Sequence, residues 1–252
     1  MKAVGESVAK PLMYYENNVG GTVNLIKAME KYECNTLIFS SSACVYGDIP
    51  LCKETDAVNA INPYGQTKIM CEQIMRDYCK ANEKFVGIAL RYFNPIGAHE
   101  SGLIGEEPKG IPNNIMPYIQ KVALSQLPHL NVFGTDYPTI DGTGIRDYIH
   151  VVDLAKGHLA AMNKELVLKG FNVYNLGTGN GTSVLELVAA VERAYGHPIK
   201  TIMQARRPGD SAKSVACVDK ANEELGWKTI FNIDDMCKDS AKWTKRNPNG
   251  YE

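Results

Sequence analysis

Tyr64 and Lys68 lie four residues apart in the segment INPYGQTK, residues 61–68. In a helix, this spacing places both side chains on one face, where an ammonium group stabilises a phenolate. A phenolate beside a lysine is a base that dehydrogenase chemistry can use. Lowering a phenol pKa from about 10 to about 7 requires ~4 kcal/mol of differential stabilisation, which Lys68 and an oxidised nicotinamide together can supply. The ordinary alternative is a tyrosine–lysine pair on a helix surface, so the pattern depends on its context.

The elements around this pair alternate between helices and strands. Residues 6–33 are predicted to form a helix, and the apolar run 37–39 begins a strand of the kind that is buried on both faces of a parallel sheet. A helix after Pro63 carries the tyrosine–lysine pair, and KFVGIALRYFNPIGAH predicts the next strand. This alternation predicts an α/β fold with a doubly wound parallel sheet.

Three serines stand where the first strand should end, which is the edge of an open α/β sheet that binds ligands. For Ser40 and Ser41 we expect an ordinary role, namely capping the next helix or bonding to the backbone of the turn. A catalytic role for Ser42 requires its hydroxyl to reach both Tyr64 and a substrate oxygen.

No glycine-rich dinucleotide loop precedes these elements. The nearest pattern is GTGNGTS, residues 177–183, in which Thr182 stands where the third glycine should be. We therefore interpret it as a loop that caps the following helix.

A change of texture near residue 99, to a stretch rich in glycine and proline, indicates a domain boundary. We expect an incomplete Rossmann-like domain over residues 1–98 and a smaller C-terminal substrate-binding subdomain over residues 99–252. FNVYNLG predicts a further strand, so the chain near residues 147–180 is expected to return to the sheet.

Composition excludes several classes of function. The chain has 252 residues, of which 27 are basic and 28 acidic, and it has no basic block, which argues against nucleic acid as a partner. Its apolar stretches are too short for a membrane span or an export signal, so we expect a cytoplasmic protein. The 7 cysteines and 5 histidines lack the spacings of disulfide frameworks or metal sites, and we assign no metal.

Isolated polar groups in loops are open to two interpretations. Arg146 and Arg206-Arg207 suit a diphosphate, because arginine is a planar fork of donors, but surface ion pairs would use them equally well. Asn113 and Asn114 are either turn residues or amide donors to a phosphate or uracil.

The segments KAVGESVAKP, YYENNVGGT, FSSSACVYG, NPYGQTK, LRYFNPIGAH, GIPNNIMPY, GIRDYIHVVDLAKGH, YNLGTG and RRPGD occur in order along residues 2–252. Together they closely resemble the UDP-glucose (UDP-galactose) 4-epimerases, which are extended short-chain dehydrogenases/reductases. The resemblance implies that Tyr64 takes the proton of the sugar 4-hydroxyl while hydride passes from C4 to NAD. Lys68 would lower the phenol pKa and hold the nicotinamide ribose, and Ser42 would relay or position the proton. The 4-keto sugar would then rotate before hydride returns to its other face.

The resemblance also implies the binding residues. For NAD they are Lys2, Asn17, Tyr64, Lys68 and Tyr92. For the UDP-hexose they are Ser42, Ala43, Cys44, Tyr92, Phe93, Asn94, Asn113, Asn114, Ile115, Asn131, Val132, Phe133, Arg146, Arg207, Asp210 and Ser214. The helices around residues 6–31 and 65–82 resemble those that pair in the family's homodimer.

The sequence departs from the family pattern in three places. The family's first strand, its glycine-rich turn and its acidic ribose-binding residue are missing, and at ~30 residues per βαβ unit this is on the order of 80 residues. Cys44 stands where the family usually has threonine, and the segment between Ser42 and Tyr64 is a few residues short. The alternative is therefore an inactive remnant of an epimerase that at most binds UDP-sugars or dimerises.

The residues near the sugar position bear on a rival reaction and on a further substrate pair. A nucleotide-sugar 4,6-dehydratase is rejected, because that class has Asp-Glu where this chain has Ala43-Cys44, which provides no donor suited to expelling water. Ser214 is small at a position resembling one where the family varies side-chain bulk, so we expect that N-acetylated UDP-hexoses also fit.

Overall fold

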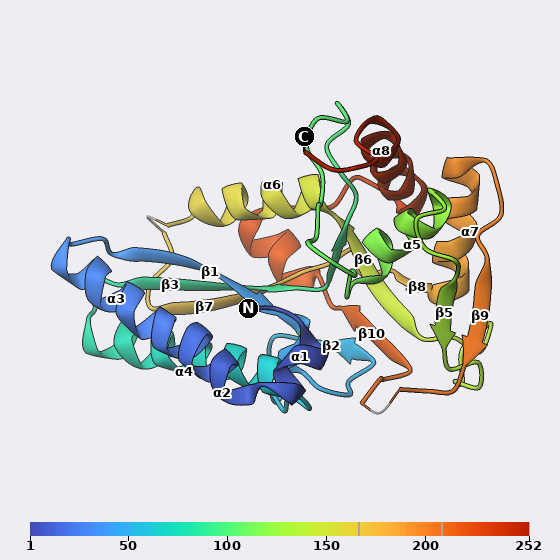
Figure 1. Cartoon of the computed structure of the whole chain (residues 1–252). Helices are drawn as coiled ribbons and strands as arrows, with labels where there is room; N and C mark the ends of the chain where they lie inside the picture. The colour runs from blue at the N-terminus through green and yellow to red at the C-terminus, as the bar shows by residue number, and fades with distance from the viewer. Residues whose placement is uncertain (166, 208, 252) are drawn as a thin grey trace. The chain divides into compact units, whose positions relative to one another are not determined.

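The computed structural model describes residues 1–165, 167–207 and 209–251 (Figure 1). They form two compact units. Unit 1 comprises Met1–Phe93, Lys156–Leu176 and Ala216–Trp227, and unit 2 comprises Asn94–Ala155, Gly177–Val215 and Lys228–Glu252.

The helices are α1 (Val4–Ala9), α2 (Pro11–Tyr14), α3 (Gly21–Lys31), α4 (Pro63–Ala81), α5 (Ile115–Ala123), α6 (Val151–Met162), α7 (Val184–Tyr195) and α8 (Ile233–Arg246). The strands are β1 (Thr36–Ser42), β2 (Leu51–Cys52), β3 (Val86–Tyr92), β4 (Asn94–Ile96), β5 (Leu130–Phe133), β6 (Ile145–His150), β7 (Phe171–Leu176), β8 (Gly181–Ser183), β9 (Thr201–Gln204) and β10 (Lys213–Ala216).

Unit 1 is built on a parallel sheet in which the described strands have the order β1-β3-β7. The register places Ser42 opposite Tyr92, and Tyr92 opposite Leu176, at the carboxyl ends of the three strands. Helix α4 covers one face of this sheet, and residues 156–162 of α6 cover the other (Figure 1). Helices on both faces of a parallel sheet are the arrangement expected from the alternation of strands and helices.

The burial of the strands differs from the sequence expectation. Residues 37–39 of β1 are only half-buried, whereas residues 87–91 of the central strand β3 are fully buried. The expectation of a first strand buried on both faces was therefore wrong. Among the described residues β1 forms the edge of the sheet, so no neighbouring strand shields its outer side.

The single helix expected over residues 6–33 is interrupted. Lys10 separates α1 from α2 with φ −133° and ψ 56°, because Pro11 disfavours the helical conformation in the residue before it. Beyond α2, the segment Tyr15–Gly20 is a π-helix, and regular α-helix resumes only at Gly21. The apolar periodicity that predicted the helix does not indicate such breaks.

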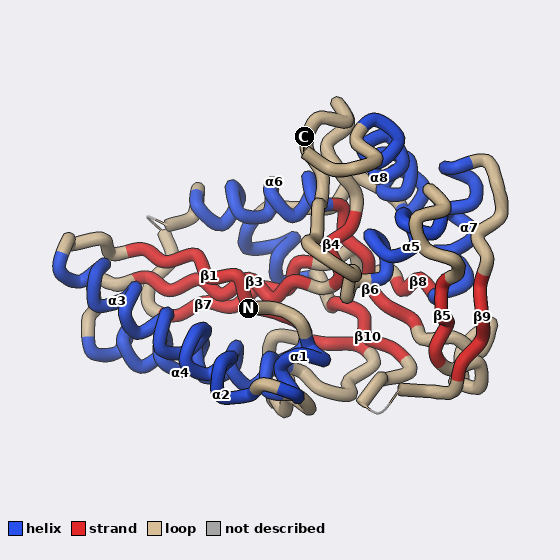
Figure 2. Tube along the Cα trace, viewed as in Figure 1, coloured by secondary structure: helices blue, strands red, loops and turns tan. Residues whose placement is uncertain are grey.

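Unit 2 contains short strands (Figure 2) and has a hydrophobic core of its own. Strand β6 pairs in parallel with β4 and β10 and antiparallel with β8, and β5 pairs in parallel with β9. The core lies between α5, α7, α8 and these strands, with Ile119 and Leu187 completely buried. Burying one such side chain contributes about 1.5–3 kcal/mol.

The segment GTGNGTS has the structural role predicted for it. It includes β8, and its Ser183 is the N-cap of α7, where the side chain accepts a hydrogen bond from the Glu186 backbone N–H at 3.0 Å. Glu186 in turn accepts from the Ser183 backbone N–H at 2.7 Å, which completes a capping box. The interpretation as a helix-capping loop is confirmed.

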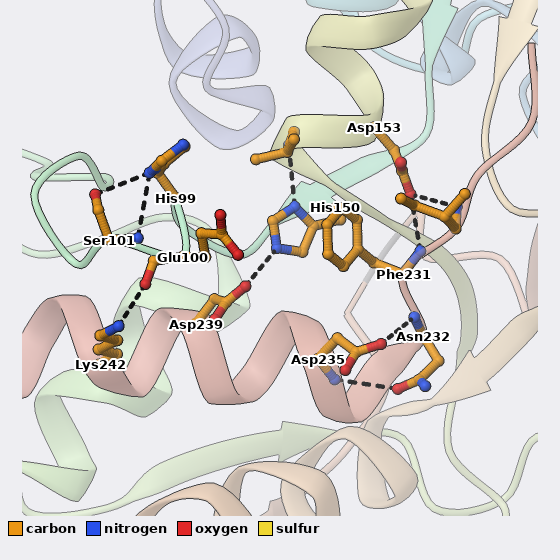
Figure 3. Close-up of polar contacts among 12 residues, drawn as sticks. His99, Glu100, Ser101, His150, Asp153, Phe231, Asn232, Asp235, Asp239 and Lys242 are labelled. Carbon is orange, nitrogen blue, oxygen red and sulfur yellow. Dashed lines mark hydrogen bonds and ion pairs between the residues drawn. The ribbon is translucent and has the colours of Figure 1, made fainter.

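Helix α8 is capped by Asn232 in the same reciprocal way (Figure 3). Its Oδ1 accepts from the backbone N–H groups of Asp234 and Asp235 at 2.9 and 3.1 Å. Because Asn232→Ala removes these acceptors, we expect the free energy of unfolding to fall by about 1 kcal/mol, measured by urea denaturation. Asn232→Asp keeps an acceptor and should unfold like the parent. Equal urea midpoints for Asn232→Ala and the parent would contradict the capping role.

No helix within the described ranges combines the length and apolar character that crossing a bilayer requires.

Candidate active site

Tyr64 and Lys68 lie in the first turns of α4. Asn62 caps this helix by accepting a hydrogen bond from the Gly65 backbone N–H at 2.8 Å, and Pro63 occupies the first helical position. Tyr64 is 9% exposed, and Lys68 is half-buried. The sequence therefore fixes the start of the helix at the point that positions both side chains.

The Lys68 ammonium group is held against the end of β1. Its Nζ donates to the carbonyl oxygen of Ser40 at 2.9 Å and lies 4.8 Å from the centre of the Phe39 ring. The same nitrogen is 5.7 Å from the centre of the Tyr64 ring. Burial lowers the pKa of Lys68, while the charges of Cys71 and Glu72 oppose that lowering. A cation is thus placed beside the phenol, as the spacing predicted.

Ser42 ends β1 within hydrogen-bonding reach of the Tyr64 hydroxyl. Burial raises the pKa of Tyr64 to about 12, and the Ser42 hydrogen bond acts in the opposite direction. The lowering expected from the sequence needed an oxidised nicotinamide beside Lys68, and in the chain by itself the pKa of Tyr64 lies above its ordinary value. The reason is that desolvation of the phenolate outweighs the local stabilising contacts.

The raised pKa of Tyr64 predicts a loss of stability at alkaline pH. The unfolded phenol, with a pKa near 10, loses its proton first, so the native state holds more protons between pH ~10 and ~12, and stability falls as pH rises through that window. Between about pH 9 and about pH 11, the free energy of unfolding should fall by about 1 kcal/mol more in the parent than in Tyr64→Phe. Urea denaturation at the two pH values measures this difference. An identical pH dependence in the two proteins would contradict the assigned pKa.

Ser40 and Ser41 do not have the capping roles expected of them. Ser41 Oγ donates to Glu72 Oε1 at 2.5 Å, across to α4, and Ser40 Oγ accepts from the Tyr92 hydroxyl at 2.7 Å. The Tyr92 oxygen also lies 2.5 Å from His158 Nε2 on α6. Both serines thus bond to side chains of neighbouring elements, because the sheet brings residues distant in sequence beside them.

Lys2 and Asn17 lie near the same end of α4. The Met1 amino group donates to Asn18 Oδ1 at 2.9 Å, and Asn18 Nδ2 donates to Thr67 Oγ1 on α4 at 3.0 Å. The side chains of Lys2 and Asn17 are themselves exposed. Ammonium, amide and hydroxyl donors near the carboxyl ends of parallel strands are the groups that bind ribose and phosphate oxygens.

The turn after β1 touches the start of α4. Ala43 and Cys44 are half-buried in a 3-10 segment, Ala43–Val45. A Cβ atom added to Gly65 would lie 2.7 Å from the Cys44 carbonyl oxygen and 2.6 Å from Ala60 Cβ. The missing side chain of Gly65 thus allows the turn and the helix to meet closely. Phe93, 6% exposed, packs in the apolar cluster beneath this turn.

Unit 2 brings part of the predicted nucleotide set together. Arg207 Nε is 2.9 Å from Asp210 Oδ2, and its guanidinium lies 4.7 Å from the centre of the Phe133 ring. Arg146 is opposite Ser214 in the β6–β10 register and donates to the carbonyl of Ile145 at 2.8 Å. Pro208 of the RRPGD segment lies outside the described residues.

The remaining predicted residues of unit 2 differ in exposure. Asn131 and Phe133 are half-buried on one face of β5, whereas the side chain of Val132 is completely buried in the core on the other face. Asn113 and Asn114 are exposed before α5, and Asn114 makes no side-chain capping bond. Ile115 begins α5, and Asn94 pairs with Tyr148. Because the Val132 side chain is buried, only the backbone of this residue is left to contact a ligand.

Two residues at the site, Glu72 and His158, were not among the sequence candidates. Glu72 lies one helical turn beyond Lys68, and this spacing can be seen in the sequence. Its partners Arg91 and Ser41, however, are 19 and 31 residues away in the chain. His158 reaches Tyr92 across 66 residues, and no local pattern indicates this contact. Within residues 1–165, 167–207 and 209–251, no group of three or more His, Cys, Asp or Glu side chains is arranged to hold a metal ion.

Comparison with known proteins gives consistent matches. Residues 1–177 match the NAD dependent epimerase/dehydratase family. UDP-glucose 4-epimerase 2 of Arabidopsis thaliana is 56% identical over 255 residues, which cover 100% of this chain and 73% of that protein.

Solved structures agree over nearly the whole chain. The UDP-glucose 4-epimerase of Bifidobacterium longum, in complex with NAD+ and UDP, is 54% identical with a TM-score of 0.95, covering 100% of this chain and 76% of that one. The enzyme of Stenotrophomonas maltophila, with bound NAD and formylated UDP-arabinopyranose, is 46% identical with a TM-score of 0.95, covering 98% and 74%. The predicted α/β class with a Rossmann-like parallel sheet is confirmed. The chain belongs to the NAD dependent epimerase/dehydratase family.

Proposed function

We propose that this chain interconverts UDP-glucose and UDP-galactose by NAD-mediated oxidation and re-reduction at sugar C4. The observation that carries the proposal is the meeting of Tyr64, Ser42 and Lys68 at the carboxyl ends of β1 and β3. The names of the similar proteins, UDP-glucose 4-epimerases with NAD and UDP or a UDP-sugar, support it.

Each of the three side chains has a distinct role in this proposal. Tyr64 takes the proton of the sugar 4-hydroxyl and later returns it, and Ser42, hydrogen-bonded to the phenol, keeps the oxygen oriented. Lys68 Nζ, fixed by the Ser40 carbonyl, holds the nicotinamide ribose and favours the phenolate. When bound, NAD supplies the oxidising and reducing chemistry at C4 and a positive charge near the phenol. Lys2, Asn17 and Tyr92 complete the proposed cofactor set.

We propose residues 1–98 as the NAD-binding domain and residues 99–252 as the nucleotide-sugar subdomain, with the chain near 147–180 contributing to the sheet. The pairing of β7 with β3 supports the last point. In the subdomain, Arg207 and Asp210 bind the UDP beside the Phe133 ring, with Arg146 contributing to the diphosphate. The other proposed sugar-nucleotide contacts are Ser42, Ala43, Cys44, Tyr92, Phe93, Asn94, Asn113, Asn114, Ile115, Asn131, Val132 and Ser214.

A homodimer that forms through the amino-terminal helices and α4 is part of the proposal. Large apolar side chains on these helices are exposed, including Leu12 at 82% and Val8 at 63%. Exposed apolar patches of this kind are typical of protein interfaces. We further propose that the protein acts in the cytoplasm, in galactose metabolism.

N-acetylated UDP-hexoses are a second proposed substrate pair. Ser214 is half-buried and its small side chain lies opposite Arg146 in the sheet register. A small side chain leaves room for an acetamido group. Turnover of UDP-glucose and UDP-galactose alone, with no conversion of UDP-N-acetylglucosamine, would exclude this extension.

The decisive experiment uses the purified chain. Denaturation and assay of the supernatant should release NAD at close to one per chain, and the native protein should convert UDP-galactose to UDP-glucose. A folded protein with neither cofactor nor turnover would support the alternative of an inactive remnant. Size-exclusion chromatography with light scattering tests the dimer separately.

A further inference from the structure

Beside the catalytic residues, unit 1 contains a buried ion pair. Glu72 on α4 is 4% exposed and Arg91 on β3 is 3% exposed. The guanidinium contacts the carboxylate as a fork, with Nε 3.0 Å from Oε1 and Nη2 2.6 Å from Oε2. Such two-pronged pairing fixes orientation as well as distance.

The pair is the centre of a larger polar network. Ser41 Oγ donates to Glu72 Oε1 at 2.5 Å, and the Arg91 guanidinium lies 4.7 Å from the centre of the Tyr46 ring. The Tyr46 hydroxyl donates to Asn175 Oδ1 at 2.6 Å. The network therefore joins α4 to all three strands β1, β3 and β7.

Three members of this network, Ser41, Arg91 and Glu72, lie close in the chain to residues of the proposed site. Ser41 precedes Ser42, Arg91 precedes Tyr92, and Glu72 follows Lys68 by one helical turn on the same face of α4. A rotation of α4 that displaced Tyr64 and Lys68 from the strand ends would also break the fork to Arg91. A slip of β1 against α4 would break the hydrogen bond from Ser41 to Glu72.

Stability alone is a weak reason for such a network. Removing two charges from water is expensive, and well-packed apolar residues often replace a buried ion pair without loss of stability. The fork instead holds α4 in one fixed position relative to the strands. A misplacement of about 1 Å at a catalytic centre lowers the rate on the order of a hundredfold, so register has a direct catalytic value.

We propose that Glu72 is a positioning residue, which through Arg91 and Ser41 fixes α4 on β1 and β3 so that Tyr64 and Lys68 meet Ser42 and Tyr92. This inference rests on the proposed function. It assigns Glu72 no contact with substrate or cofactor.

The test is the double variant Glu72→Leu/Arg91→Met, which removes both charges and leaves neither unpaired. We expect its urea midpoint to match that of the parent and its KM for UDP-galactose to stay within about twofold, while kcat falls by a factor of about 10 to 100. NADH binding, followed by fluorescence, should weaken about tenfold as Lys68 loses its place. A folded double variant with parental kcat and parental NADH affinity would overturn the proposal.

Two further variants keep the test decisive. Ser41→Ala removes only one hydrogen bond and should lower kcat about two- to tenfold without changing KM. If the double variant does not fold, Ser41→Ala decides the test, and parental kcat with parental NADH affinity in this variant would refute the proposal. Arg193→Met breaks the surface ion pair with Asp234, in which each side chain is 59% exposed, and should leave kcat and NADH affinity unchanged. A parent that binds NADH without turnover would contradict the proposed function, and the NADH comparison would still decide the role of Glu72.

Discussion

Replacing Tyr64 by phenylalanine is expected to lower kcat with UDP-galactose by a factor on the order of 10³, because the substitution removes the group that we propose exchanges a proton with the sugar 4-hydroxyl. The ring itself is retained, so the packing of this buried side chain is preserved. Binding of UDP should be unchanged, since Arg146, Arg207 and Asp210, which we propose bind the UDP, lie in unit 2. Coupled measurement of UDP-glucose formation and calorimetric titration with UDP give the two quantities.

Tyr32→Phe is the matched control for this variant. Tyr32 is 74% exposed, so the loss of its hydroxyl group should alter neither kcat nor stability. If Tyr64→Phe retained more than about a tenth of the parental kcat, Tyr64 would not be the base, since general acid–base catalysis contributes at least about 10².

Gly65→Ala is expected to affect both stability and activity. Its new Cβ atom would lie 2.7 Å from a backbone oxygen of the turn after β1, closer than any ordinary contact, so the first turn of α4 must move. We expect a loss of about 1–3 kcal/mol of unfolding free energy. Because Tyr64 is the preceding residue, kcat should also fall, on the order of 10²-fold for a displacement of about 1 Å.

Gly21→Ala is the control for the glycine substitution. Gly21 also begins a helix, with φ −60° and ψ −42°, and an added Cβ atom meets nothing within 4 Å. The alanine should therefore raise stability by about 0.4–1 kcal/mol, because it restricts the unfolded chain. Urea denaturation distinguishes the two cases, and equal midpoints for Gly65→Ala and Gly21→Ala would contradict the steric argument.

Local patterns were enough to predict the fold class and the central pair of the site. Strands and helices alternate at short range, so the parallel α/β sheet follows from periodicity along the chain. The spacing of Tyr64 and Lys68 is likewise a property of one helix, and the structure places Lys68 Nζ beside the Tyr64 ring.

Interactions between distant segments could not be predicted in this way. The bonds of Ser41 to Glu72 and of Tyr92 to Ser40 depend on the strand order, which no single segment specifies. The lysine spacing likewise did not predict that burial, a property of the assembled fold, raises the pKa of Tyr64 in the chain without a bound nicotinamide. The helix break at Lys10, by contrast, has a local cause in Pro11, which the expectation of one helix over residues 6–33 did not include.

The strand order β1-β3-β7 also has a consequence for folding. Ser42 lies opposite Tyr92, and Tyr92 opposite Leu176, so the sheet under the proposed site joins segments that are far apart in the chain. Sheets of such high contact order form slowly, because the entropy of closing long loops must be overcome before the pairing stabilises them. During synthesis, the central strand β3 can therefore gain its second neighbour, β7, only after residue 176 has been added to the chain.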